Sequence, residues 1–161
     1  MAQGAVDLSN LPSIDDPGKI AILKSKWYPE LTTRLADTCA SVLREHGYRE
    51  VDIHTLPGSL ELPLAAADLL ANDVAGRIDA IVCFGIIVKG ETLHFEMITN
   101  ECMRGLGNVM REYRRPIIVE ILPVLEMVHA EARAGDDELN KGYEAAAAAI
   151  EMVAWRREQL R

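Results

Sequence analysis

Apolar and polar residues follow one another in blocks that predict four strands alternating with five helices. The strand-like runs lie at residues 19–23, 51–56, 80–88 and 116–122. Apolar positions spaced as on one face of a helix lie at residues 32–46, 60–72, 94–114, 124–134 and 140–158. In the 94–114 stretch this apolar stripe includes Phe95, Ile98, Met103, Leu106, Val109 and Met110.

This alternation determines the fold class that we expect. Strands joined by helical crossovers form one parallel sheet with helices on both faces. The chain is therefore predicted to be an α/β protein, a three-layer α/β/α sandwich with a four-stranded parallel, flavodoxin-like sheet. Residues 1–17, which are polar and acidic, are expected to be an arm that is disordered or docks on a neighbour. Residues 18–161 are expected to form a single domain.

The end of the 80–88 strand carries a strong local signal for a binding site. Lys89-Gly90-Glu91-Thr92 follows the strand, Gly90 permits a turn, and Thr92 is expected to cap the next helix. His94 then falls in the first turn of that helix. Free amides at a helix start bind anions, and an imidazole beside them transfers protons near neutral pH. Ligands of parallel sheets bind at the carboxyl ends of the strands, so residues 25–27 and 58–61 are expected to meet there as well.

Composition and charge exclude several classes of protein. The formal net charge is −8, which argues against a nucleic-acid partner. No apolar run reaches the roughly 18 residues of a membrane span, and the start lacks a signal pattern. The three cysteines, an odd number inside apolar patterns, indicate reduced core residues of a cytoplasmic protein rather than a metal site or disulfides. Walker and dinucleotide-binding motifs are missing, and so is the phosphate loop of a flavodoxin-type flavin site.

Three motifs, taken together, resemble the lumazine synthase family, the penultimate enzymes of riboflavin biosynthesis. In the order of the family they are Pro-Gly-Ser-Leu-Glu-Leu-Pro at 57–63, the stretch 85–95, and Arg133-Ala-Gly followed by Asn140-Lys-Gly. The likeness covers about residues 20–155. It implies condensation of 5-amino-6-ribitylamino-uracil with 3,4-dihydroxy-2-butanone 4-phosphate, releasing phosphate and water without a cofactor or metal.

The resemblance assigns the pyrimidine and ribityl subsites to Trp27, Ser59, Leu60, Glu61, Ile87, Val88, Val119 and Lys141. Trp27 would stack on the pyrimidine ring; the alternative is a core aromatic at a strand end. Ser59 and Glu61 would hold the ribityl hydroxyls, and Ser59 could also cap a helix. The backbone of Ile87 and Val88 would meet the pyrimidine edge while their side chains serve the core. For Lys141, an ion pair with Glu144 is favoured over a place near the phosphate.

The same resemblance assigns the phosphate and the proton transfers. Glu91 and Thr92 match the turn whose amides and hydroxyl take the phosphate, and Arg133 would reach the same phosphate from a neighbouring subunit. Without the family motif, Arg133 would be interpreted as a solvated helix-end arginine. His94 would act in turn as base and acid. Its loss is expected to slow the reaction without abolishing it, because orientation of the substrates supplies much of the rate.

This chain departs from the family pattern at several of these positions. Val119 stands where a neighbour's phenylalanine usually closes over the pyrimidine, and Glu120 replaces a glycine. Asp136-Asp-Glu-Leu139 replaces a basic, glycine-bearing turn near the phosphate entrance, and Lys26-Trp27-Tyr28 replaces Arg-Phe-Asn. These departures make the sandwich around the pyrimidine thinner and the phosphate entrance more acidic.

The family forms pentamers that in many members build an icosahedral shell, so a pentamer is expected here, alone or within such a shell. Riboflavin and riboflavin synthase are further candidate partners. Two other hypotheses remain open at this point. One is a non-catalytic relative that binds flavin or forms a shell, favoured by Trp27. The other is a generic phosphate-binding α/β domain, which explains the helix start but not the three motifs together.

Overall fold

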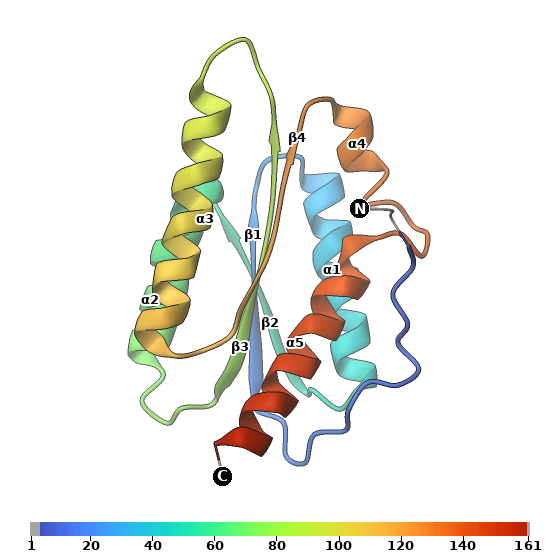
Figure 1. Ribbon diagram of the computed structural model, residues 1–161, viewed down its shortest axis with the longest axis vertical. Helices are drawn as coiled ribbons and strands as arrows, with labels where there is room; N and C mark the ends of the chain where they lie inside the picture. Colours follow the sequence, from blue (N-terminus) through green and yellow to red (C-terminus); the bar gives the residue numbers. More distant parts are fainter. Residues whose placement is uncertain (1–3, 161) are drawn as a thin grey trace.

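The computed structural model describes residues 4–160, which form one parallel sheet between two layers of helices (Figure 1). The strands are β1 (Lys19–Ser25), β2 (Glu50–Leu56), β3 (Ile78–Val88) and β4 (Ile117–Val124), in the order β2-β1-β3-β4. The helices are α1 (Pro29–Glu45), α2 (Leu62–Asn72, preceded by the 3-10 turn η1, Ser59–Glu61), α3 (His94–Tyr113), α4 (Met127–Glu131) and α5 (Lys141–Gln159). Helices α1 and α5 cover one face and α2 and α3 the other, which confirms the predicted three-layer fold.

Strand β3 is the centre of the core because it contributes side chains to both layers. Val82 and Phe84 lie in the cluster under α1 and α5, whereas Ile81 and Cys83 lie in the cluster under α2 and α3. Successive strand residues point to opposite faces, so a strand buried on both sides needs the unbroken apolar run seen in the sequence.

Helices α1 and α5 approach each other closely through small residues of α5. A Cβ built on Gly142 would lie 2.5 Å from the carbonyl oxygen of Leu35 in α1. The alanine-rich stretch that follows supplies further small, buried side chains, namely Ala145, Ala146, Ala147 and Ala149. The start of α5 is thereby fixed against α1.

Two helix predictions were wrong. Helix α4 covers only Met127–Glu131 rather than 124–134, because β4 runs on to Val124, which pairs with Val88 at the end of β3. Met103 and Met110 are 44% and 36% exposed, so they do not belong to the buried stripe of α3. Leu106 and Val109 are buried as predicted, Cys102 is buried beside them, and Phe95 and Ile98 pack against the same core cluster.

The capping prediction for Thr92 was also wrong. The residue before the first turn of α3 is Leu93, and no side chain caps this helix. Leu93 already has helical backbone angles, and its carbonyl accepts hydrogen bonds from the amides of Glu96 and Met97. Helix α3 therefore begins directly after the turn, without a polar capping side chain.

The arm docks on its own chain over the part that the structure describes. Leu8, Leu11 and Ile14 pack against the core cluster under α1 and α5. The guanidinium of Arg157 donates to the carbonyls of Asp15 and Asp16 and joins this segment to the end of α5. Residues 1–3 of the predicted arm, and residue 161 of the predicted domain, lie outside the described residues.

The three cysteines are buried and free, as predicted. Burial raises the pKa of the Cys39 and Cys83 thiols, and it raises the pKa of Cys102 to about 11, so all three stay protonated in the core. Among residues 4–160, no helix has both the length and the apolar character that crossing a membrane requires.

Candidate active site at the carboxyl ends of the strands

The three segments predicted to meet at the carboxyl ends of β1, β2 and β3 line one open cavity of about 420 Å³. The loop after β1 contributes Trp27 and Tyr28, the loop after β2 contributes residues 57–61, and β3 with the start of α3 contributes residues 86–88 and His94. The prediction follows from the parallel order of the sheet, because every crossover returns the next strand with its carboxyl end at the same edge.

Trp27 presents its ring to solvent at this cavity, with 60% of the residue exposed. The left-handed backbone of Tyr28 (φ 54°, ψ 57°) forms the turn, at a cost of about 1 kcal/mol for a non-glycine residue. The amides of Leu31 and Thr32 donate to the Tyr28 carbonyl over 3.0 Å and hold the turn at the start of α1. This placement excludes the alternative of a core aromatic. The Lys26 ammonium lies 5.8 Å from the centre of the indole.

Ser59 and Glu61 bring a hydroxyl and a carboxylate to the same cavity. A Cβ built on Gly85 would lie 2.5 Å from Ser59 Oγ, so this glycine of β3 leaves the room that the buried hydroxyl occupies. A Cβ built on Gly58 would lie 2.9 Å from Glu61 Oε2 and 3.7 Å from Trp27 Nε1. The Glu61 carboxylate and the Trp27 indole therefore both border the space beside Gly58.

Ser59 caps no helix in the structure, so its hydroxyl is available to a ligand. The residues before η1 and α2 are Gly58 and Glu61, and neither helix start has a side-chain cap. Leu60 is 44% exposed and also lines the cavity.

Of the remaining predicted residues near the end of β3, some line this cavity and others lie outside it. His94 is the first residue of α3, is exposed and lines the cavity. Ile87 and Val88 line it too, while their side chains pack into the two opposite core clusters, as expected of plain core residues. Glu91 and Thr92 are exposed in the turn and lie outside the cavity lining.

Arg133 lies at a different cavity, of about 360 Å³, beside the carboxyl end of β4. Leu122–Leu125 and His129 line this cavity with it, and Arg133 Nη1 donates to the carbonyl of His129 over 2.8 Å. Val119 faces the α2 and α3 side of the same outer strand and is partly buried. Within one chain, Arg133 and His94 therefore line separate cavities.

The acidic turn that replaces the family's basic one is held by internal contacts. Asp136 pairs with Arg34 of α1, with 3.0 Å between the carboxylate and Nε. Asp137 accepts a hydrogen bond from the amide of Leu139 over 2.9 Å. Lys141 forms the predicted ion pair with Glu144. Two of the acidic side chains thus have partners within this chain.

Sequence reasoning assigned no role to Asn140, although it is 97% buried between this turn and α5 (3% exposed). Its Oδ1 accepts a hydrogen bond from the amide of Gly142 over 2.7 Å, so it caps α5. The signal that could have found it is an asparagine directly before an apolar-periodic helix, a strongly preferred capping position.

Comparison with known proteins assigns this arrangement to a family. The family model described as 6,7-dimethyl-8-ribityllumazine synthase matches residues 17–157. The chain belongs to this lumazine synthase family. Curated members are similar along most of their length. The protein of Aquifex aeolicus is 37% identical over 137 residues, which are 84% of this chain and 87% of the relative. That of Stenotrophomonas maltophilia (strain K279a) is 37% identical over 140 residues, 86% and 88% of the two chains. The Thermococcus gammatolerans protein is 34% identical over 135 residues, 84% and 85% of the two chains.

Glu120, where the resemblance leads one to expect glycine, is a carboxyl group set into the outer strand. Burial and, to a smaller extent, the nearby Glu144 carboxylate raise its pKa, Lys141 lowers it in part, and the resulting pKa is about 7. The folded chain thus favours the protonated acid. This contribution to stability is complete below the ordinary value of 4.5 and is lost as the pH rises through about 7.

Replacing Glu120 with glutamine is therefore expected to stabilise the protein only at the higher pH. The free energy of unfolding should rise by about 1–3 kcal/mol near pH 8 and change little near pH 4. Urea unfolding of Glu120→Gln at both pH values measures this difference, with the exposed Glu126→Gln as the matched control. An equal gain at both pH values would contradict the assignment of the effect to the buried charge.

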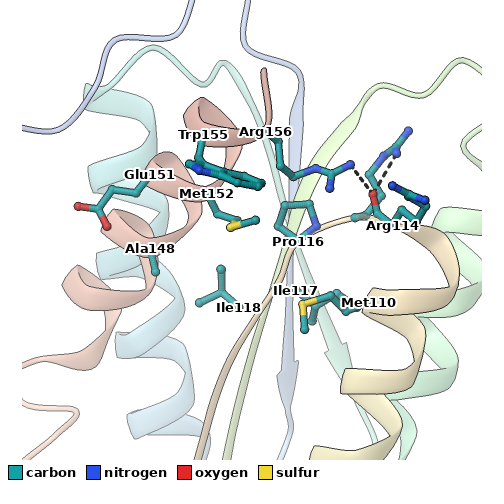
Figure 2. A pocket seen from close by; sticks show the side chains of 11 residues that line it. Met110, Arg114, Pro116, Ile117, Ile118, Ala148, Glu151, Met152, Trp155 and Arg156 are labelled. Carbon is teal, nitrogen blue, oxygen red and sulfur yellow. Dashed lines mark hydrogen bonds between the residues drawn. The ribbon is translucent and has the colours of Figure 1, made fainter. Parts of the chain in front are cut away.

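A larger cavity, of about 530 Å³, lies at the opposite end of β4 between the end of α3 and α5 (Figure 2). Apolar side chains form much of its wall, namely Met110, Pro116, Ile117, Ile118, Met152 and Trp155. Arg115 and Arg156 both donate to the carbonyl of Arg114 beside it, over 3.3 and 2.8 Å. None of the predicted site residues lines this cavity, and Trp155 is 55% exposed there.

Proposed function

We propose that this chain is a transferase that condenses 5-amino-6-ribitylamino-uracil with 3,4-dihydroxy-2-butanone 4-phosphate to 6,7-dimethyl-8-ribityllumazine, releasing phosphate and water. The observation that carries this proposal is the single cavity shared by Trp27, Ser59, Glu61 and His94. It combines a stacking surface, acceptors for a polyol and a proton-transfer group. The three buried, protonated thiols favour a cytoplasmic setting for this riboflavin-pathway step.

The pyrimidine would bind against the exposed indole of Trp27, because an aromatic face offers a large contact area at low entropic cost. Ser59 Oγ and the Glu61 carboxylate would accept hydrogen bonds from the ribityl hydroxyls. Backbone groups of Ile87 and Val88 would meet the polar edge of the ring. The loop after β1, the turn η1 after β2 and the end of β3 would thus orient this substrate.

The phosphate of the second substrate would bind at the turn before α3, close to His94. Backbone amides at residues 91–92 and the positive end of the helix dipole favour a dianion there. The side chain of Glu91 would point away from it. Arg133 of the next subunit would add a fork of donors that matches two phosphate oxygens.

His94 would serve the proton transfers of the condensation. The amine of the pyrimidine attacks the butanone carbonyl, and an imine forms as water leaves. Removal of a proton from carbon then drives loss of phosphate, and closure of the second ring expels water. An imidazole that takes and returns protons near neutral pH serves each step in turn.

We further propose that the chain works as a ring of five copies, alone or as the unit of an icosahedral shell. Two features support this arrangement. Arg133 and His94 line separate cavities of one chain, so a second copy would be needed to bring them together. Strand β4 ends the sheet, and its outer side adjoins the apolar cavity at Trp155 (Figure 2). A repeated head-to-tail contact of this kind forms a ring when the rotation between neighbouring copies closes.

Replacing Trp155 with glutamate is expected to dissociate this ring, because a carboxylate buried at an apolar contact loses its hydration without gaining a partner. Light scattering of the purified variant would show a mass near that of one chain. The control is Val74→Glu, at a residue that is 97% exposed in the turn between α2 and β3. An unchanged mass for Trp155→Glu would show that the ring does not use this surface.

The proposed reaction is tested by mixing the purified protein with both substrates and following phosphate release together with lumazine absorbance. Turnover with both signals is the expected result. The exposed Trp27 also favours a second candidate function, a non-catalytic relative that binds flavin by stacking. Absence of turnover together with tight riboflavin binding would support that candidate and reject the synthase.

A further inference from the structure

Three consecutive carbonyl groups in the turn between α4 and α5 each accept one hydrogen bond, two from the start of α5 and one from α1. The carbonyl of Arg133 accepts from the amide of Lys141 over 2.8 Å. The carbonyl of Ala134 accepts from Arg34 Nη1 over 3.1 Å. The carbonyl of Gly135 accepts from Asn140 Nδ2 over 2.7 Å. The backbone on the carboxyl side of Arg133 is thus tied to both α1 and α5.

Asn140 joins this turn to the helix through one carboxamide. Its Nδ2 donates to Gly135, while its Oδ1 accepts from the amide of Gly142. A carboxamide carries its donor and its acceptor on two separate atoms, whereas an ionised aspartate has acceptors alone and a serine has one shorter hydroxyl, which cannot reach both partners. The side chain is buried, so water does not replace the lost donor freely.

The direction of the Arg133 side chain depends on this backbone. The guanidinium has one hydrogen bond of its own, to the carbonyl of His129 in the preceding turn of chain. The start of α5, in contrast, is fixed because Gly142 packs against the backbone of Leu35 in α1. Through its two hydrogen bonds, Asn140 links the fixed start of α5 to the backbone segment that carries Arg133.

We propose that Asn140 is a positioning residue for phosphate binding, which holds the backbone of Arg133 where its guanidinium reaches the phosphate of the neighbouring site. This inference rests on the proposed synthase activity and deepens it. Asn140 itself touches no substrate. Its effect should therefore appear in the affinity for the phosphate-bearing substrate rather than in every kinetic constant.

The decisive variants are Asn140→Ser and Asn140→Asp, which keep an acceptor for the helix cap and lose the donor to Gly135. Both should raise KM for the butanone phosphate on the order of 10-fold, since small misplacements of a binding group cost this much or more. The KM for the uracil substrate should stay near wild type, and kcat should fall by a smaller factor than the KM for the butanone phosphate rises. The melting temperature should fall by about 2–8 °C, because capping is retained and the buried bond to Gly135 is the one that is lost.

Two comparisons make the result specific. If Asn140→Ser and Asn140→Asp raise the KM for the butanone phosphate by a similar factor, the added negative charge of aspartate is not the cause, because serine is neutral. Asn72→Ser is the matched control, because Asn72 makes a similar bond to the carbonyl of Asp68 at the end of α2, away from the site. Hydrogen exchange of the Lys141 amide, which bonds to Arg133, should be faster in both Asn140 variants and unchanged in Asn72→Ser.

A wild-type KM for the butanone phosphate in both Asn140 variants would overturn the inference. So would a parallel change of both KM values and kcat that follows a loss of melting temperature, as a purely structural role predicts. A wild-type protein that turns over neither substrate would reject the proposed synthase instead, and the two failures are thereby distinguished.

Discussion

Replacing Arg133 with alanine is expected to lower kcat/KM for the butanone phosphate by about 10²–10³-fold, because the proposed bidentate, charge-assisted contact of its guanidinium with the phosphate would be lost. The leaving phosphate also gains charge as the reaction proceeds, so kcat should fall along with the rise in KM. Steady-state kinetics with each substrate varied in turn measure the two effects separately.

Two further variants show whether the guanidinium itself matters. Arg133→Lys keeps the positive charge but loses the fork of donors, so it should recover only part of the activity. Arg49→Ala is the matched control, since Arg49 is an exposed arginine just before β2, at the opposite end of the sheet from the cavity. Full activity in Arg133→Ala would remove Arg133 from the site.

Mixing two strongly weakened variants tests whether Arg133 acts on a neighbouring copy. In rings assembled from equal amounts of Arg133→Ala and His94→Ala chains, about a quarter of the sites combine an intact His94 with an intact Arg133. Activity should therefore reappear after joint refolding or coexpression. If both residues served the same chain, every site would carry one defect and mixing would restore nothing.

Replacing His94 with alanine is expected to slow the single-turnover rate by about 10²-fold, the lower end of what a general acid–base group contributes. The reaction should not be abolished, because in the proposed mechanism the cavity would still orient both substrates, and that orientation would supply much of the rate. Rapid-quench measurement of lumazine formation, with enzyme in excess, isolates the chemical steps from product release.

Imidazole added to His94→Ala should restore part of the rate, which a structural defect would not allow. The matched control is His46→Ala, because His46 lies at the end of α1 and its ring bonds to the carbonyl of Val42. A complete loss of turnover in His94→Ala would contradict the view that orientation carries most of the catalysis.

The residues of the main cavity could be predicted from the sequence because the carboxyl ends of parallel strands, and the residues that follow them, lie at the same edge of a sheet. Apolar runs identify the strands, helical periodicity identifies the crossovers, and both are local properties of the chain. Trp27, Ser59 and His94 each follow a strand within a few residues, so their convergence follows from the strand order alone. The three motifs then indicated the family that the comparisons confirm.

Local patterns failed where packing or strand pairing decided the outcome. Met103 and Met110 fit a helical period, yet the sheet covers only the face that carries Leu106. The apolar residues up to Val124 suit a helix or a strand, and pairing with β3 made them strand. Sequence periodicity indicates which residues prefer burial, whereas the packing of neighbouring elements determines how much of a helix or strand is buried.

The sequence by itself determined the α/β class, the carboxyl-edge cavity and the residues of the three motifs. Only the tertiary structure decided that Arg133 and His94 line separate cavities of one chain, that Asp136 pairs with Arg34, and that Asn140 holds the turn. The physical reason is that these contacts join residues that lie far apart in the sequence. Arg34 and Ala134 bond across 100 positions of sequence, and such a contact exists only after α1 and α5 have packed together.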